Sequence, residues 1–228
     1  MSAPAAGVAL ERPSLLRFDR VERAAHWVTA LMFLVLIFTG AALYFTFLVE
    51  LVGRRRLLER VHVDVGLALP LPLVVSLAGS WGKGLRSDLK RLNRWTLDDR
   101  RWFRRALRRE PTSDLVLGKF NPGQKLNAAF VGGVLLVMLM TGSVMHWEYY
   151  WPLSWRTGAT VVHETLAFVF MAVVAGHIGM ALAHPGALRA MFTGRVSRPW
   201  AQRHAPAWLA EVDETESLSH DQGGGPTP

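Results

Sequence analysis

Four long apolar blocks, separated by arginine-rich or polar stretches, constrain the fold of this chain more than any other feature. They run over residues 24–47, 61–81, 126–147 and 160–183. Each holds roughly 20 residues or more, enough at about 1.5 Å per residue to cross a hydrocarbon core of about 30 Å. Pro70 and Pro72 lie inside the second block and predict a kink there. The pattern predicts an all-α integral membrane four-helix bundle over residues 17–212.

The two ends of the chain carry no further apolar block. Residues 1–16 predict a short N-terminal arm, without the apolar stretch of a signal peptide. Residues 213–228 are acidic and then rich in glycine and proline, and they predict a disordered tail.

Positive charge predicts the orientation of the spans. If the N-terminus is cytoplasmic, 21 of the 26 Lys and Arg residues fall on the cytoplasmic side, which favours both termini in the cytoplasm. The net charge of +8 follows from this arrangement, and nucleic acid binding is not indicated. The arginine run of residues 100–109, inside the loop 82–125, predicts a surface helix on anionic head groups. A docking face for another subunit is the alternative.

Histidine is the residue type that points to chemistry. The chain contains no cysteine, so any redox centre that it binds must use histidine, methionine or carboxylate ligands. Four of its eight histidines lie inside or at the edges of the apolar blocks. They are His26, His62, His163 and His177. An ionisable side chain in a transmembrane segment is typically functional.

Helix geometry sorts these histidines into two pairs. His163 and His177 are 14 positions apart, which puts them on one helix face and about 21 Å apart along the axis. With the orientation above, His62 joins His163 at the outer side, and His26 joins His177 at the cytoplasmic side. Two imidazoles facing each other across an apolar bundle suit the axial positions of a b-type haem. The sequence therefore predicts two haems b that transfer electrons and have no open iron position.

A flat macrocycle between helices needs small side chains beside it. Four glycines of the apolar blocks are candidates for this role: Gly40, Gly66, Gly142 and Gly176. Glycine is also common in membrane helices for packing reasons alone, so their presence is a weaker signal than the histidines.

Other assignments of the histidines stay open. His146 is an alternative to His62, and His184 is an alternative to His177, although Pro185 directly after it marks a helix end. All four paired histidines could be structural in a non-redox anchor or transporter. Two histidines lie in polar sequence and are expected to be solvated: His204 and His220.

Several stretches together resemble one family. They are residues 17–20 with His26-Trp27, residues 119–125, His163-Glu164, residues 184–194 and residues 196–204. They are similar to the membrane cytochrome b (gamma) subunits of respiratory formate dehydrogenases. Around His62 the sequence departs from the family pattern, because it lacks the expected His-Arg pair.

The resemblance implies a cofactor set and a site for each cofactor. It implies two haems b, with ligands at the positions of the four paired histidines. It also implies a quinone, menaquinone or ubiquinone, reduced near the cytoplasmic haem by the turn that holds Asn121, Gly123 and Gln124. An amide can hydrogen-bond a quinone carbonyl. Asn121 before Pro122 also suits a helix cap, and the two roles are compatible.

The resemblance also implies partners and a location. The chain would be the electron-transferring, quinone-reducing subunit in a bacterial inner membrane, joined by an iron–sulfur (beta) subunit in the periplasm. A molybdenum or tungsten catalytic (alpha) subunit would oxidise formate. The cytochrome b of a nickel–iron hydrogenase, or of another respiratory dehydrogenase, is the alternative within this class.

Overall fold

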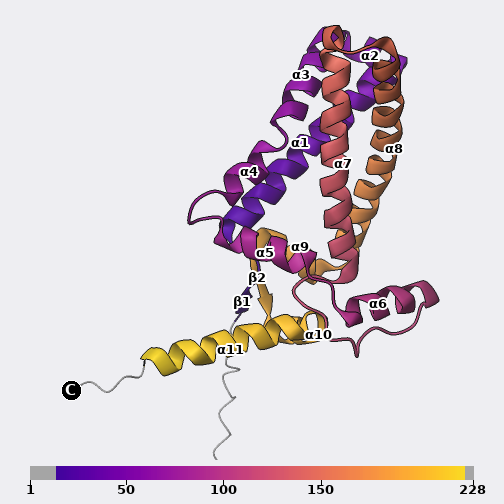
Figure 1. Ribbon diagram of the computed structural model, residues 1–228. Coiled ribbons are helices and arrows are strands. Elements are labelled where there is room, and N and C mark those ends of the chain that lie inside the picture. Colours follow the sequence, from indigo (N-terminus) through magenta and orange to yellow (C-terminus); the bar gives the residue numbers. More distant parts are fainter. Residues whose placement is uncertain (1–13, 224–228) are drawn as a thin grey trace, which may run out of the picture.

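The computed structural model describes residues 14–223, which form four long helical spans above a base of short elements (Figure 1). The spans are Arg20–Tyr44, Arg55–Leu77, Pro122–His146 and Leu153–Ala183. All four are long and apolar enough to cross a membrane, with mean hydropathy between 1.5 and 2.2. The prediction of a helical protein with four candidate membrane spans is confirmed.

Three spans are single helices, and one is broken. The single helices are α1 (Arg20–Tyr44), α7 (Pro122–His146) and α8 (Leu153–Ala183). The second span joins α3 (Arg55–Ala68) to α4 (Leu71–Leu77). The break falls next to Pro70 and Pro72, because proline has no N–H to donate and its ring blocks the preceding turn. The kink predicted for this block is therefore present.

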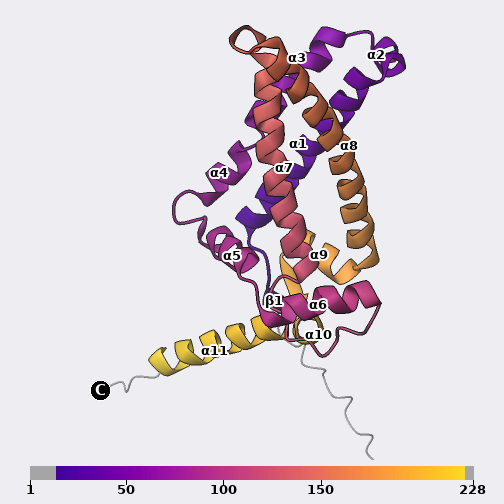
Figure 2. The same cartoon turned by 45° about the vertical axis from the view of Figure 1, so that its right-hand side comes forward.

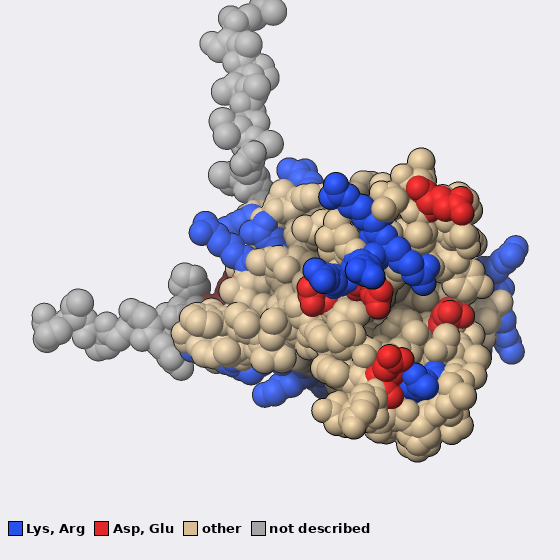
Figure 3. All heavy atoms as spheres, turned by 90° about the horizontal axis from the view of Figure 1, so that it is seen from above, with Lys and Arg blue, Asp and Glu red and all other residues tan. Residues whose placement is uncertain are grey.

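The two ends of the spans differ in structure. At one end, called here the α2 end, the connections are α2 (Thr46–Val52) and the 3-10 helix η1 (Glu148–Tyr150). At the other end, called the base, lie α5 (Lys83–Asn93), α6 (Leu97–Arg108), α9 (Pro185–Thr193), α10 (Arg198–His204) and α11 (Pro206–Gly223). The strand that begins the described chain and α11, which ends it, are both at the base (Figures 1 and 2). Viewed onto the α2 end, Figure 3 shows Lys and Arg side chains beside Asp and Glu.

Side-chain caps set where the spans begin. The Asp19 carboxylate accepts from the backbone N–H of Glu22 at 2.8 Å, and the Glu22 carboxylate accepts from that of Asp19 at 2.6 Å. Asn121 and Gln124 form the same reciprocal pair at the start of α7. Such capping boxes satisfy backbone N–H groups that have no partner inside the helix. Both therefore fix a helix start at the base.

A two-stranded ribbon ties the two ends of the described chain together. Strands β1 (Ser14–Leu16) and β2 (Arg195–Ser197) pair antiparallel, with Leu15 opposite Val196. Both of these side chains are buried in the core of the base, together with Trp208 of α11. Beside them Arg17 donates to the carbonyl of Lys119, and burial lowers the pKa of Arg17 to about 10. Arg17 therefore stays protonated near neutral pH.

Buried ion pairs hold the helices of the loop 82–125 against the spans. The Lys125 ammonium, on α7, contacts the Asp99 carboxylate, on α6, at 2.7 Å. The Lys119 ammonium contacts Asp88 of α5 and lies 3.7 Å from the Glu22 carboxylate of α1. All five side chains are buried. These contacts explain how a strongly charged loop becomes an ordered base.

Some of the predicted boundaries differ from the structure. The tail expected to be disordered from Asp213 is helical to residue 223, because α11 continues and Arg198 bonds the carboxylates of Asp213 and Glu216 at 2.6 and 2.7 Å. The fourth span begins at Leu153, earlier than residue 160, after the extended Pro152. The arginine run does lie on the predicted exposed helix, α6. Most of the expected N-terminal arm, residues 1–13, and the last five residues lie outside the described chain.

Candidate functional site

The structure brings the four histidines together as the two expected pairs. His62 of α3 and His163 of α8 lie toward the α2 end, with ring centroids 6.3 Å apart. His26 of α1 and His177 of α8 lie toward the base, also with ring centroids 6.3 Å apart. Each pair therefore joins two different helices, and α8 supplies one ring to each.

The distance inside each pair fits two axial ligands of one metal. A bond from a metal to an imidazole nitrogen is about 2 Å, and that nitrogen lies about 1.2 Å from the ring centroid. Two imidazoles on opposite sides of one metal therefore have centroids about 6 Å apart. Within residues 14–223, no three His, Asp or Glu side chains gather to hold a bare metal ion. The pairs suit a metal whose other ligands come from a macrocycle, as in haem.

Glycines stand where two of the rings need space. A Cβ atom added at Gly40 would lie 3.2 Å from Cε1 of His62, and one at Gly142 would lie 3.3 Å from Cε1 of His163. Both distances are tighter than ordinary contacts. Gly66 faces Leu36 instead, and a Cβ at Gly176 would meet nothing within 4 Å. Two of the four expected glycines therefore border the His62–His163 pair.

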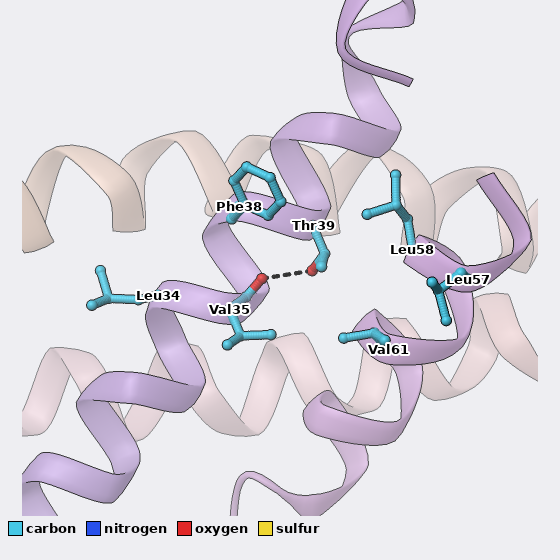
Figure 4. Close-up of a pocket in the computed structure, with 7 residues that line it drawn as sticks. All are labelled: Leu34, Val35, Phe38, Thr39, Leu57, Leu58 and Val61. Carbon is cyan, nitrogen blue, oxygen red and sulfur yellow. Dashed lines mark hydrogen bonds between the residues drawn. The ribbon is translucent and has the colours of Figure 1, made fainter. Parts of the chain in front are cut away.

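Two threonines next to these glycines were not predicted from the sequence as part of the site. The hydroxyls of Thr39 and Thr141 each lie 2.9 Å from Nδ1 of a paired histidine, His62 and His163 respectively. A Thr-Gly pair inside the first and the third apolar block, at 39–40 and 141–142, is the signal that could have found them. A shallow apolar groove between α1 and α3 also reaches Thr39 (Figure 4).

The alternative histidines lie elsewhere. His146 ends α7 at the exposed α2 end, where its ring contacts Trp147. His184 follows the end of α8, is exposed, and shares a hydrogen bond with the carbonyl of Met180. His204 is exposed and stacks on Trp200. The side chain of His220 lies outside the described part of the chain.

The turn of residues 121–124 lies at the base, the end that also holds His26 and His177 (Figure 1). Its two amide oxygens are occupied by the cap of α7, so the NH₂ groups of Asn121 and Gln124 remain as donors. A Cβ at Gly123 would lie 3.4 Å from the ring of Trp102, so α6 packs closely on this turn. Within the described residues, the turn therefore combines amide NH₂ groups that have no hydrogen-bond acceptor with the aromatic ring of Trp102.

The surface of the spans suits a membrane. Between 6% and 11% of the residues in the most apolar window of each span are buried inside the chain. Large apolar side chains such as Phe38, Leu136 and Leu182 are more than half exposed. Such a surface requires apolar surroundings, which lipid and apolar cofactors supply.

The curated relatives are similar to this chain over nearly its full length. The formate dehydrogenase cytochrome b556(fdo) subunit of Escherichia coli K12 is 28% identical over 90% of this chain and 96% of that protein. The nitrate-inducible cytochrome b556(Fdn) subunit of the same organism is 23% identical over 92% and 97%. The formate dehydrogenase cytochrome b556 subunit of Haemophilus influenzae is 23% identical over 92% and 90%.

The family assignment rests on a longer pattern than any single motif. A family profile described as prokaryotic cytochrome b561 matches residues 17–194, which include all four spans and all four paired histidines. Haem and electron transport follow from this family. The chain belongs to the prokaryotic cytochrome b561 family.

Proposed function

We propose that this chain is the membrane cytochrome b subunit of a formate dehydrogenase, and that it carries electrons across the bilayer to a quinone. The observation that carries the proposal is the pair of facing imidazoles near each end of the spans. The names of the relatives point to formate as the source of electrons. Membership of a cytochrome b family disfavours the non-redox anchor or transporter.

The four paired histidines would hold two haems b. His62 and His163 would hold one haem, and His26 and His177 would hold the other, because the ring separation in each pair suits two bonds to one iron. Two imidazoles held on one haem iron would leave no position open for oxygen, so each haem would supply one-electron transfer. The apolar side chains of the spans would exclude water from both sites.

Orientation gives the proposed direction of transfer. The base carries most of the Lys and Arg residues, which favours a cytoplasmic base and cytoplasmic termini in a bacterial inner membrane. The His62–His163 pair would then face the periplasm. Electrons from a periplasmic iron–sulfur subunit would enter at this end and leave at the base. A molybdenum or tungsten subunit would oxidise formate, in line with the formate dehydrogenase names of the relatives.

The turn at the start of α7 is the proposed quinone contact. The NH₂ groups of Asn121 and Gln124 can donate to a quinone carbonyl while the amide oxygens of both residues cap the helix. The ring of Trp102 lies beside Gly123 and offers a flat apolar face. The turn lies at the base, so protons for the reduced quinone would come from the cytoplasmic side.

Replacing Asn121 with aspartate should separate these two roles. Aspartate caps a helix as well as asparagine does but has no NH₂ donor, so the fold should persist. We expect re-oxidation of the dithionite-reduced chain by added quinone to slow several-fold, as loss of a hydrogen bond of about 1 kcal/mol predicts. Asn121→Ala should show the same loss and also cost about 1 kcal/mol of stability through the lost cap. A normal rate in Asn121→Asp would remove this residue from the quinone site.

The electron donor is tested in membranes of the source bacterium. Under anaerobic conditions, formate should reduce the haem signal that is lost when this chain is deleted, and hydrogen gas should not. Reduction by hydrogen and not by formate would replace the formate assignment with the hydrogenase alternative. Reduction by neither would point to another respiratory dehydrogenase.

A further inference from the structure

Two helix hairpins, α1–α3 and α7–α8, hold the His62–His163 pair in the same way. Thr39 of α1 bonds His62, 23 residues later, and Thr141 of α7 bonds His163, 22 residues later, both at 2.9 Å. The glycine after each threonine lies against the same ring atom, Cε1, of its histidine. The α1–α3 and α7–α8 hairpins thus repeat one arrangement.

The hydrogen bond from each threonine hydroxyl to a backbone carbonyl shows which group donates in the threonine–histidine contact. The hydroxyl of Thr39 donates to the carbonyl of Val35 at 2.8 Å (Figure 4), and that of Thr141 donates to the carbonyl of Val137 at 2.8 Å. A hydroxyl has one proton, so its oxygen is then left to accept. The donor in each contact is therefore the Nδ1–H group of the histidine, and Nε2 carries the free lone pair.

This arrangement suits a metal ligand and affects its electronics. A hydrogen-bond acceptor on Nδ1–H fixes the tautomer and orientation of a ligating imidazole and makes its Nε2 a stronger electron donor. A stronger donor favours the oxidised iron and lowers the reduction potential of the haem. In residues 14–223 no such hydrogen bond reaches the ring nitrogens of His26 or His177. The two pairs therefore differ in their hydrogen bonding.

We propose that Thr39 and Thr141 are positioning residues that hold His62 and His163 as Nε2 ligands and keep their haem at the lower of the two reduction potentials. The inference rests on the proposed function, since it requires two haems. It also explains the proposed direction, because electrons that enter at the His62–His163 haem then move to the haem of higher potential. Neither threonine would touch the iron; each would act through its histidine.

An equilibrium redox titration of the detergent-purified full chain tests this proposal. In Thr39→Val and Thr141→Val, which keep the shape but remove the hydroxyl, the lower of the two midpoint potentials should rise and the upper should stay. Thr39→Ser and Thr141→Ser should restore the lower value. The matched control is Thr160→Val, because the Thr160 hydroxyl donates to the carbonyl of Arg156 at 3.0 Å and, among the described residues, forms no hydrogen bond with a histidine. This variant should shift neither potential.

Haem content keeps the test decisive if a valine variant is unstable. Loss of one haem in Thr39→Val, with two haems retained in Thr39→Ser, supports the positioning role. Two haems at unchanged potentials in both valine variants overturn the threonine proposal, as does a shift confined to the upper potential. Absence of haem from the unsubstituted, folded chain counts against the proposed function itself, so the two failures are distinguishable.

Discussion

Purified His163→Ala protein should contain about one haem per chain, against about two in the unsubstituted chain, because a b-type haem needs both axial imidazoles. His62→Ala should give the same result. The remaining haem should be the one held by His26 and His177, whose rings lie 6.3 Å apart toward the base. The pyridine haemochrome spectrum, divided by the protein concentration, measures the haem content.

Electron transfer through the chain should be lost when the His62–His163 haem is lost. If electrons enter at the His62–His163 end, formate-dependent quinone reduction in membranes should be almost abolished in His163→Ala, since the haem that would receive these electrons is then missing. The matched controls are His146→Ala and His184→Ala, which remove exposed histidines outside both pairs. Both should retain two haems. A normal haem content in His163→Ala, or the loss of a haem in His146→Ala, would contradict the assignment.

Lys125→Met should destabilise the base more than any exposed charge change. The substitution leaves the Asp99 carboxylate, which is 1% exposed, without its ammonium partner at 2.7 Å. Breaking a buried pair in this way costs about 3–5 kcal/mol. For a chain of this size such a loss lowers the midpoint of thermal unfolding by roughly 10 °C. A thermal scan of the detergent-solubilised protein measures the shift.

An exposed ion pair on α6, the helix that holds Asp99, supplies the control. Arg101 and Asp98 form a pair at 3.0 Å, with the Arg101 side chain 61% exposed. Exposed pairs contribute about 0–1 kcal/mol, so Arg101→Ala should move the midpoint by only a few degrees. Equal shifts in the two variants would show that the Lys125–Asp99 contact does not hold α6 against α7.

Hydropathy and helix periodicity were sufficient to predict the spans and the histidine pairs. The spans are long, strongly apolar segments, and such segments need no tertiary information. The pairing followed from the spacing of His163 and His177 together with the direction of each span. The structure places both pairs as expected, while their role as haem ligands stays a proposal.

The structure of the base and the hydrogen bonds to the histidines could not be predicted from the sequence. Lys125 and Asp99 are 26 residues apart, and Arg17 and Lys119 are 102 apart. Contacts over such distances depend on the complete fold. The helix through Asp213 was missed for the same reason, because its order comes from packing of α11 and from Arg198. In the sequence, nothing at Thr39 itself distinguishes it from an ordinary threonine of a membrane helix.

A dithionite-reduced minus oxidised absorption spectrum of the purified, unsubstituted chain, with haem quantified per polypeptide, tests the central claim most directly. The two histidine pairs predict a b-type spectrum and about two haems per chain. A folded chain that binds no haem, or that binds only one when haem is in excess, would contradict the account.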